Sequence, residues 1–567
     1  MRIADIEAPD ATARVPERTL WLLTIAAILV GAIVRIGVVR WTDPWDTHHP
    51  DEHILPLDAV ALWEGVTPRE VGWPGSTTRL IHSVVEASQC VFEEGGAMWA
   101  ERARPDRALA IVSAWIGRRY VAPQPLYRMG RTISVITGTL QLIAVAWALS
   151  QWMGPIGTLI GTLAMALSPV AVAHSQYVLA DITGLLFGTI ALGLAARPTP
   201  RRAIAMAALV GLAASSKFHF GLWVTTPLLC VWLGDRAVFR QKRLLLIAVV
   251  ATMAWVVVTF VPWFITNPLL ALKEFAGVVL VKVGHGSPFA RIPAHVTIIF
   301  GAFGAVGWMG VLASGGHLRA EDRRRLAPVA IPLVLATVAL LLSATVFDRY
   351  AMVLLPGAAI LTGLGWDEWL RHPRATIRGS AAVAFALCLV ATIISLVYSQ
   401  RVIGEADVDV LARNWIVANV PPGSRVAVHD EMNAYLPRAA DQLRACAERV
   451  ITTAAYEEKW LVEGVKTSVA DAKPMESMVL NDEQFAAYWC RRELLAGNLN
   501  SFHIVTFHDE RRFGSILERD AIDGFRGRAH HDMPPLDVLV MNRPVDVGVP
   551  PAQIFRTARG QRVIYRR

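Results

Sequence analysis

Two adjacent carboxylates, Asp51 and Glu52, follow the first long apolar stretch of the chain, residues 20–39. Ionisable side chains at the end of an apolar stretch are costly to place and usually have a task. A carboxylate held against a hydroxyl group can remove its proton as the oxygen attacks, and a second carboxylate can raise its basicity or orient the attacking molecule. The alternative is that Asp51 caps a helix starting at His53, because Pro-Asp-Glu is a common helix start. The residues themselves leave both interpretations open.

Other ionisable residues stand where further apolar stretches begin or end. Asp181 precedes one of them, so it either serves the same chemistry or caps the helix that begins there. Arginine binds phosphate through two parallel hydrogen bonds and lysine offers a point charge, so basic residues in such places suit a phosphate-bearing ligand. The alternative for the long side chains is snorkelling towards lipid headgroups. The candidate phosphate-binding residues are Arg131, Lys217, His285 and Arg349.

His48 and His49 stand next to the first pair of carboxylates, and together these groups permit a divalent metal ion. The cluster lacks the spacing of a zinc motif, so we expect no defined metal site. Five cysteines are too few for a disulfide scaffold. Cys446 and Cys490 can pair only if their region faces an oxidising compartment.

The composition is that of a membrane protein, with 54% hydrophobic and 18% charged residues and a mean hydropathy of +0.41. A helix needs roughly 20 mostly apolar residues to cross a bilayer. About eleven stretches fit, with the two short ones at 203–216 and 219–234 forming either two spans or one tilted hairpin. The predicted spans are 19–39, 132–150, 156–175, 178–196, 203–216, 219–234, 244–265, 294–313, 327–346, 350–366 and 379–399.

The formal charge of +8 comes largely from arginines grouped in short segments between apolar stretches. This distribution indicates membrane orientation rather than nucleic-acid binding, because cytoplasmic loops concentrate Arg and Lys. Counting spans puts every group on one side, which predicts a multi-pass protein of the cell (inner) membrane with a cytoplasmic N-terminus. The groups are Arg14/Arg18, Arg197/Arg201/Arg202, Arg236/Arg240/Lys242/Arg243, Arg319/Arg323/Arg324/Arg325 and Arg371/Arg374/Arg378.

The expected fold is a polytopic α-helical membrane domain, residues 1–400, followed by an extracytoplasmic α/β domain, residues 401–567. The first outer loop, 40–130, spaces apolar residues in a helical rhythm, which predicts interfacial helices along the membrane surface. In the tail a helix over 408–420 precedes short apolar strands, an alternation typical of a layered α/β domain. The predicted strands are 425–429, 502–507, 537–541 and 562–565.

A series of short motifs occurs in order along residues 1–400, at span boundaries that the count above places on the outer side. They are His49-Pro50-Asp51-Glu52, Arg131 to Thr139, Ala166-Leu167-Ser168-Pro169, His174-Ser175, Asp181, Gly211-Leu212-Ala213 with Ser216-Lys217, Gly284-His285-Gly286, Arg349-Tyr350 and Leu355-Pro356. In this order they resemble the GT-C superfamily of polyprenyl-phosphate-sugar-dependent glycosyltransferases. The nearest resemblance is to bacterial glycosyltransferase family 39, which includes protein-mannosyltransferase-like and lipid A aminoarabinose transferase-like proteins.

The resemblance implies a GT-C fold and an inverting transfer of a sugar from a polyprenyl-phosphate donor to an extracytoplasmic glycan, lipid or protein hydroxyl. It gives the catalytic work to Asp51, Glu52 and Asp181 and the donor phosphate to the four basic candidates. Three alternatives stay open: a protein O-mannosyltransferase, a transporter or flippase for a lipid-linked sugar, and a non-catalytic assembly protein whose outer domain binds a partner. Transporters commonly show paired repeats, and we detect none in this sequence.

Overall fold

The chain forms two compact units in the computed structural model. The first comprises Met1–Gly37, Val135–Ser175 and Ala180–Val397, and the second comprises Val38–Ser134, Gln176–Leu179 and Tyr398–Arg567. The structure describes residues 16–37, 55–56, 59, 76–121, 124–235, 238–261, 291–315, 320–343, 347–404, 408–421, 424–429, 503–508, 516–517, 536, 538–541, 545, 549–557 and 560–566.

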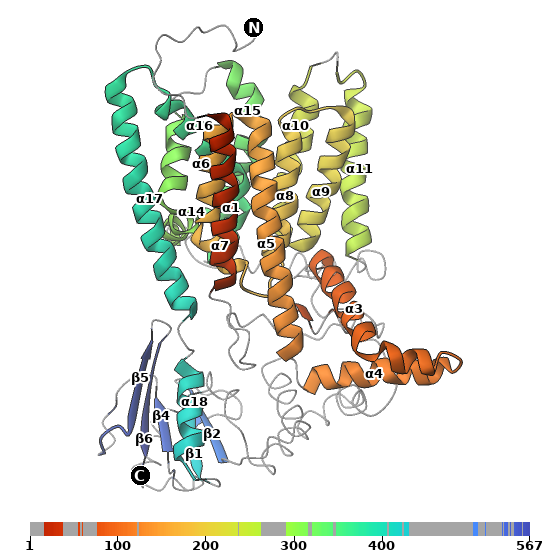
Figure 1. The fold of residues 1–567 in the computed structure, drawn as a ribbon, viewed down its shortest axis with the longest axis vertical. Coiled ribbons are helices and arrows are strands. Elements are labelled where there is room, and N and C mark those ends of the chain that lie inside the picture. Colours follow the sequence, from red (N-terminus) through yellow and green to blue (C-terminus); the bar gives the residue numbers. More distant parts are fainter. Residues whose placement is uncertain are drawn as a thin grey trace. The chain divides into compact units, whose positions relative to one another are not determined.

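A helix occupies each of the eleven stretches predicted to cross the membrane, so the polytopic helical fold is confirmed (Figure 1). Among the described residues, seven helical stretches are long and apolar enough to cross a bilayer, judged by length and composition. The helices that occupy the eleven predicted stretches are α1 (Glu17–Gly37), α5 (Gln124–Trp152), α6 (Pro155–Ala166), α7 (Pro169–His174), α8 (Asp181–Ala195), α9 (Pro200–Ser216), α10 (Thr225–Leu233), α11 (Lys242–Phe260), α14 (Ile292–Gly315), α15 (Ala320–Leu341), α16 (Leu355–Leu370) and α17 (Ala375–Gly404).

The helices of the first unit bury one another along their inner faces and keep apolar side chains outside. Helix α16 packs against α6 and α14, and α9 packs against α8 and α11. On the outside, Trp255 of α11 is 72% exposed and Leu387 of α17 is 67% exposed. Apolar side chains on the outer surface of a helical bundle suit lipid as the surrounding solvent. The exterior therefore supports the membrane assignment made from composition.

The span predicted over 156–175 is broken in two. Helix α6 ends at Ala166, and α7 begins at Pro169, where the Ser168 hydroxyl accepts the backbone N–H of Ala171 at 3.3 Å. A serine cap followed by proline at the first helical position is a strong helix start, so the sequence itself specifies the break. The short second piece ends at His174.

A buried arginine supplies hydrogen bonds to the backbone and side chains at the break between α6 and α7. Arg35 of α1 is fully buried, and its guanidinium donates to the carbonyl oxygen of Ala166 at 3.2 Å and to the hydroxyl of Ser175 at 3.1 Å. The last carbonyls of a helix have no partner within the helix. Arg35 satisfies one of them and ties α1 to both sides of the break, which fixes where α7 ends.

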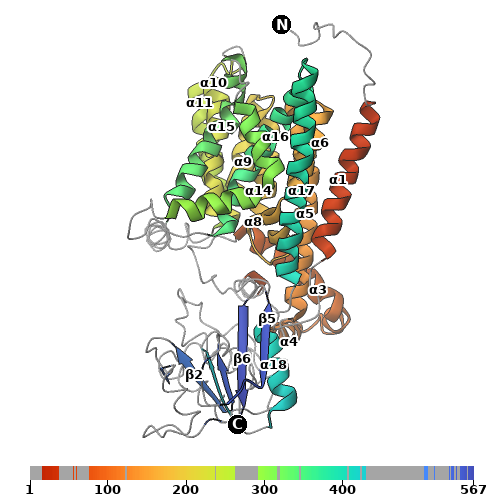
Figure 2. The same cartoon turned by 90° about the vertical axis from the view of Figure 1, so that its left-hand side faces the viewer.

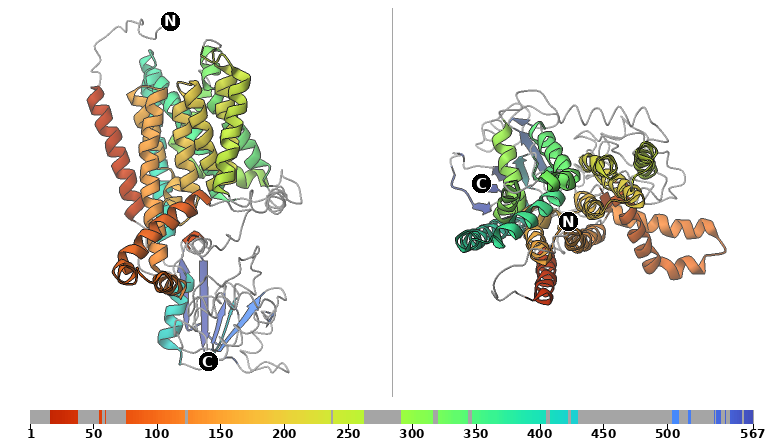
Figure 3. Two further views of the ribbon diagram at one scale, coloured as in Figure 1. Left: turned by 90° about the vertical axis from the view of Figure 1, so that its right-hand side faces the viewer. Right: turned by 90° about the horizontal axis from the view of Figure 1, so that it is seen from above.

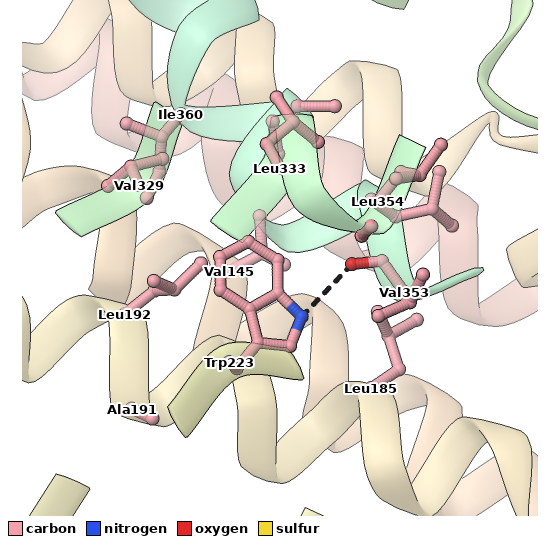
Figure 4. Packing of buried hydrophobic residues seen from close by; sticks show 14 of the residues in the cluster. Val145, Leu185, Ala191, Leu192, Trp223, Val329, Leu333, Val353, Leu354 and Ile360 are labelled. Atoms are coloured by element: carbon pink, nitrogen blue, oxygen red, sulfur yellow. Dashed lines mark hydrogen bonds between the residues drawn. The ribbon is translucent and has the colours of Figure 1, made fainter. Parts of the chain in front are cut away.

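Two later spans begin with a 3₁₀ segment, η4 (Phe218–Val224) before α10 and η6 (Asp348–Leu354) before α16. The buried indole N–H of Trp223 donates to the carbonyl oxygen of Val353 at 3.0 Å and so joins the two segments. Figure 4 shows this bond within the apolar core, with Leu333 and Leu354 near the indole ring. The bond fixes the starts of two spans that lie far apart in the sequence.

In the second unit, α3 (Ser76–Ala100) and α4 (Pro105–Val121) form a helical hairpin (Figure 3), and α3 buries mainly polar side chains. Polar side chains of α3 such as His82 and Glu86 are fully buried, whereas Val84 is 59% and Phe92 is 89% exposed. An apolar outer face fits the interfacial position predicted for this loop. That placement stays a prediction.

The tail carries a six-stranded sheet in the order β3-β2-β1-β4-β6-β5, beside helix α18 (Val408–Asn419) (Figure 2). Neighbours β3, β2, β1 and β4 pair in parallel, and β6 pairs antiparallel with β4 and β5. The four predicted strands are all present, and β3 and β5 are additional. The strands are β1 (Arg425–His429), β2 (His503–His508), β3 (Ile516–Leu517), β4 (Val538–Met541), β5 (Gln553–Thr557) and β6 (Gly560–Arg566).

Candidate functional site

Asp181 is the first residue of α8, and its side chain is fully buried. The helix cap is Ala180, with no side-chain capping bond, so Asp181 does not fill the capping role considered from the sequence. Neither of its oxygens accepts a hydrogen bond from any residue that the structure describes. Burial of a carboxylate is costly unless opposite charges compensate it. The groups around Asp181 therefore decide what this position can do.

Two basic groups approach Asp181 from the segment that follows α9. The Nζ atom of Lys217 lies 3.9 Å from Oδ2, and Nε2 of His219 lies 3.9 Å from Oδ1. Lys217 has an extended backbone (φ −157°, ψ 125°) between the end of α9 and the start of η4, which turns the chain towards α8. The His219 ring stands beside Phe220 and Tyr350, at centroid distances of 4.8 and 5.6 Å.

Gly184 allows this approach. It lies one helical turn after Asp181, and a Cβ atom there would come within 2.6 Å of the Phe220 ring. Real side chains do not pack that closely, so any larger residue would push Phe220 away from α8. Because Phe220 follows His219 directly, the missing side chain at position 184 sets how near the imidazole comes to the carboxylate.

Segment η6 supplies another acid–base pair. Asp348 Oδ1 accepts the backbone N–H of Arg349 at 2.7 Å and lies 3.6 Å from Nε2 of His174, the last residue of α7. The Arg349 guanidinium stands over the rings of Phe347 and Tyr350, with its central carbon 4.9 and 5.7 Å from their centroids. Helix α7, the short second piece of the third span, thus ends at a histidine that faces the start of another span.

Four basic groups act electrostatically on Asp181. Two of them are permanent cations, and the other two are imidazoles that ordinarily titrate near neutral pH. With both imidazoles neutral the two cations balance Asp181 and Asp348, and each protonated imidazole adds one positive charge. A cluster of this kind suits a phosphate anion, since cations and N–H donors converge on a largely buried place. The four groups are Lys217, Arg349, His174 and His219.

The structure brings together three of the seven residues predicted for the site, Asp181, Lys217 and Arg349. Arg131 is buried in α5 but belongs to the second unit, so its role stays a prediction. The remaining three, Asp51, Glu52 and His285, lie outside the described residues.

The residues selected for the site from the sequence did not include His174, His219 or Asp348. The signals were present but short: His219 follows Lys217 by two residues, and Asp348 directly precedes Arg349. Only the end of α7 was undetectable, because the motif His174-Ser175 does not show that the helix stops there. Among the described residues, no group of three or more His, Cys, Asp or Glu could hold a metal ion. His48 and His49 lie outside them.

No protein-family model and no curated protein matches the chain. Among solved structures, ArnT of Cupriavidus metallidurans bound to undecaprenyl phosphate is similar, with 16% identity, 96% of this chain and 97% of that chain covered, and a TM-score of 0.46. The oligosaccharyltransferase AglB of Archaeoglobus fulgidus, in complex with an inhibitory peptide and a dolichol-phosphate, shows 12% identity, with 92% and 69% covered and a TM-score of 0.44. Both are GT-C glycosyltransferases, the superfamily that the motifs resemble. Identities and scores this low assign no residue a role and no substrate.

Proposed function

We propose that this chain is an integral-membrane glycosyltransferase that moves a sugar, with inversion, from a polyprenyl-phosphate donor to an extracytoplasmic acceptor. The observation that carries the proposal is the convergence of Asp181, Lys217 and Arg349. These residues stand at three different span boundaries and were selected from the sequence for this chemistry. Their side chains are almost fully buried within a helical unit whose exterior is apolar.

The two parts of the donor require different surroundings. Its prenyl chain prefers lipid or apolar helix surfaces, whereas its phosphate needs cations to receive the charge that develops as the sugar leaves. Lys217 and Arg349 would hold the phosphate, and Asp181 would hold their side chains in place and accept hydroxyl groups of the sugar. The neighbouring rings of Tyr350 and Phe347 limit the directions in which the guanidinium can point.

The attacking hydroxyl must lose its proton, and Asp51 is the proposed base for that step, with Glu52 orienting the acceptor. Attack opposite the phosphate inverts the anomeric carbon. A flippase would move the lipid-linked sugar without breaking this bond, so release of the free polyprenyl phosphate distinguishes the two functions.

The test separates donor binding from transfer. The protein and its variants are placed in lipid nanodiscs, undecaprenyl phosphate binding is measured, and release of undecaprenyl phosphate from lipid-linked sugars of the source membrane is followed. Lys217→Ala and Arg349→Ala should each weaken binding by about tenfold or more, the loss of a charge-assisted hydrogen bond. Asp51→Asn should bind undecaprenyl phosphate normally and release none.

Arg378→Ala is the control, because Arg378 is an exposed arginine in the first turns of α17. It should bind and release like the wild type. A fully active Asp51→Asn protein would refute the base assignment. Equal loss of donor and acceptor binding in Arg349→Ala would show that Arg349 supports the fold rather than the phosphate.

A further inference from the structure

Helix α14 is kinked at Gly304, midway along its length. The backbone there has φ 71° and ψ 173°, a conformation that essentially only glycine adopts. A Cβ atom at this position would also come within 2.6 Å of the Thr392 side chain on α17. The glycine therefore fixes the kink, which divides α14 into a first half, residues 292–303, and a second half, residues 305–315.

Two side chains take the place of the backbone hydrogen bond that the kink interrupts. In a regular helix the N–H of Val306 would donate to the carbonyl oxygen of Ala302, four residues earlier. Here the N–H of Val306 donates to the Thr392 hydroxyl at 3.1 Å. The carbonyl oxygen of Ala302 accepts the Ser168 hydroxyl at 2.7 Å. Because Ser168 is also the cap of α7, one hydroxyl joins the end of the first half of α14 to the start of α7.

Near its other end, the first half of α14 is tied to the segment before η6. The Nε2 atom of His295, a buried residue, lies 3.0 Å from the carbonyl oxygen of Ser343. A carbonyl oxygen only accepts, so this nitrogen carries the proton of the hydrogen bond. Ser343 stands five residues before Asp348, where η6 begins. Helix α14 also packs against both α7 and η6, so it holds the two segments whose ends form the His174–Asp348 pair.

We infer that the first half of α14 is a brace that holds η6 against α7, with Ser168 and His295 as positioning residues for the donor phosphate. The inference rests on the proposed function, in which Arg349 binds that phosphate. Arg349 follows Asp348 in η6, and Asp348 lies 3.6 Å from His174 at the end of α7. A change in the spacing of the two segments therefore moves the guanidinium relative to the rest of the cluster. Hydrogen bonds to phosphate weaken steeply when the donor leaves its angle and distance, so both residues act without touching the donor.

The experiment measures binding of farnesyl phosphate, a short and soluble form of the leaving group, by calorimetry with the full-length protein in nanodiscs. Ser168→Ala removes the bond to Ala302 and the cap of α7, and it should weaken binding by about tenfold. Thr362→Ala is the matched control, because the Thr362 hydroxyl donates to the carbonyl oxygen of Gly307 at 2.7 Å, beyond the kink. It should stay within about twofold of the wild type, since it holds the other half of α14. Ser168→Thr, which keeps a hydroxyl, should restore most of the affinity.

Two further comparisons test the other end of the brace and the kink itself. His295→Ala should weaken binding by about fivefold, and His295→Gln, whose amide can donate to the same carbonyl, should weaken it less. Gly304→Ala should weaken binding by about tenfold or more, because alanine does not adopt this backbone conformation. Gly301→Ala is its control in the first half of α14, since a Cβ atom there meets nothing within 4 Å.

A double-mutant cycle separates positioning from a general loss of stability. In an Arg349→Ala background, Ser168→Ala should weaken binding by less than about twofold further, because the residue through which it acts is gone. Full additivity of the two effects, or equal losses in Ser168→Ala and Thr362→Ala, would overturn the inference and leave the proposed function intact. A wild type that bound no farnesyl phosphate would instead contradict the proposed function, and the inference with it.

Discussion

Among the residues that the structure describes, two carboxylate–histidine pairs have a fully buried carboxylate, and they are built differently. Asp181 and His219 in the first unit are 3.9 Å apart, and Glu86 and His82 in the second unit are 3.8 Å apart. The second pair lies on one helix, four residues apart, and both side chains are fully buried. Burial lowers the pKa of His82 to about 4, so its ring is uncharged at neutral pH.

The first pair joins separate segments of the chain and remains partly open. Its histidine is partly exposed, and two permanent cations, Lys217 and Arg349, act on the same carboxylate. A closed pair on one helix stabilises the packing of that helix, whereas an open pair among cations can meet an anionic ligand. A buried His–carboxylate pair is therefore not by itself a site. What surrounds the pair decides its use.

Removing the two carboxylates should give the sharpest contrast. Asp181→Asn should lower release of undecaprenyl phosphate by about 100-fold or more, because it removes the charge that organises the cations. Glu86→Gln should leave release within about threefold and lower the stability of the fold by about 1–3 kcal/mol, the effect of disturbing a buried polar pair. Release assays and thermal unfolding of both variants check this. A release defect of equal size in Glu86→Gln would erase the distinction between the pairs.

Two glycines of α8 test how closely η4 must approach. In Gly184→Ala the new methyl group would meet the Phe220 ring at 2.6 Å, and in Gly188→Ala at 3.7 Å, an ordinary contact. We expect the first to weaken farnesyl phosphate binding by about tenfold, equivalent to overpacking by roughly 1–3 kcal/mol. The second should change it less than twofold. Equal binding by both variants would mean that the position of His219 does not depend on this contact.

The smallest effect concerns the bond that joins η4 to η6. Trp223→Phe removes the hydrogen bond to the carbonyl of Val353 and should cost about 1 kcal/mol of stability, with about fivefold weaker binding of farnesyl phosphate. Trp366→Phe is the matched control, because its buried indole donates to the carbonyl of Val306 at 2.9 Å within the same unit. It should lose similar stability and keep its affinity. Loss of affinity in both would show that general destabilisation, not the link between the segments, is being measured.

Much of the fold could be predicted from the sequence because its signals are local. Apolar stretches of the right length mark the helices, and short apolar runs in the tail mark strands such as β1, whose bounds agree at both ends. Ser168 and Pro169 also signal a helix start within the third span, although 156–175 was predicted as one continuous span. The edge strand β5 was not predicted, because Gln553–Thr557 has no long apolar run to distinguish it from a loop.

The local sequence specifies which segments form helices and where charged residues stand at the ends of spans, since helix formation and the cost of charge in lipid depend on neighbouring residues. Which of those charges meet depends on how the helices pack in three dimensions. Asp181, Lys217 and Arg349 come together because Gly184 admits Phe220 and because Trp223 reaches a carbonyl 130 residues away. Such contacts depend on the packing of whole helices against one another, and no local pattern of residues encodes them.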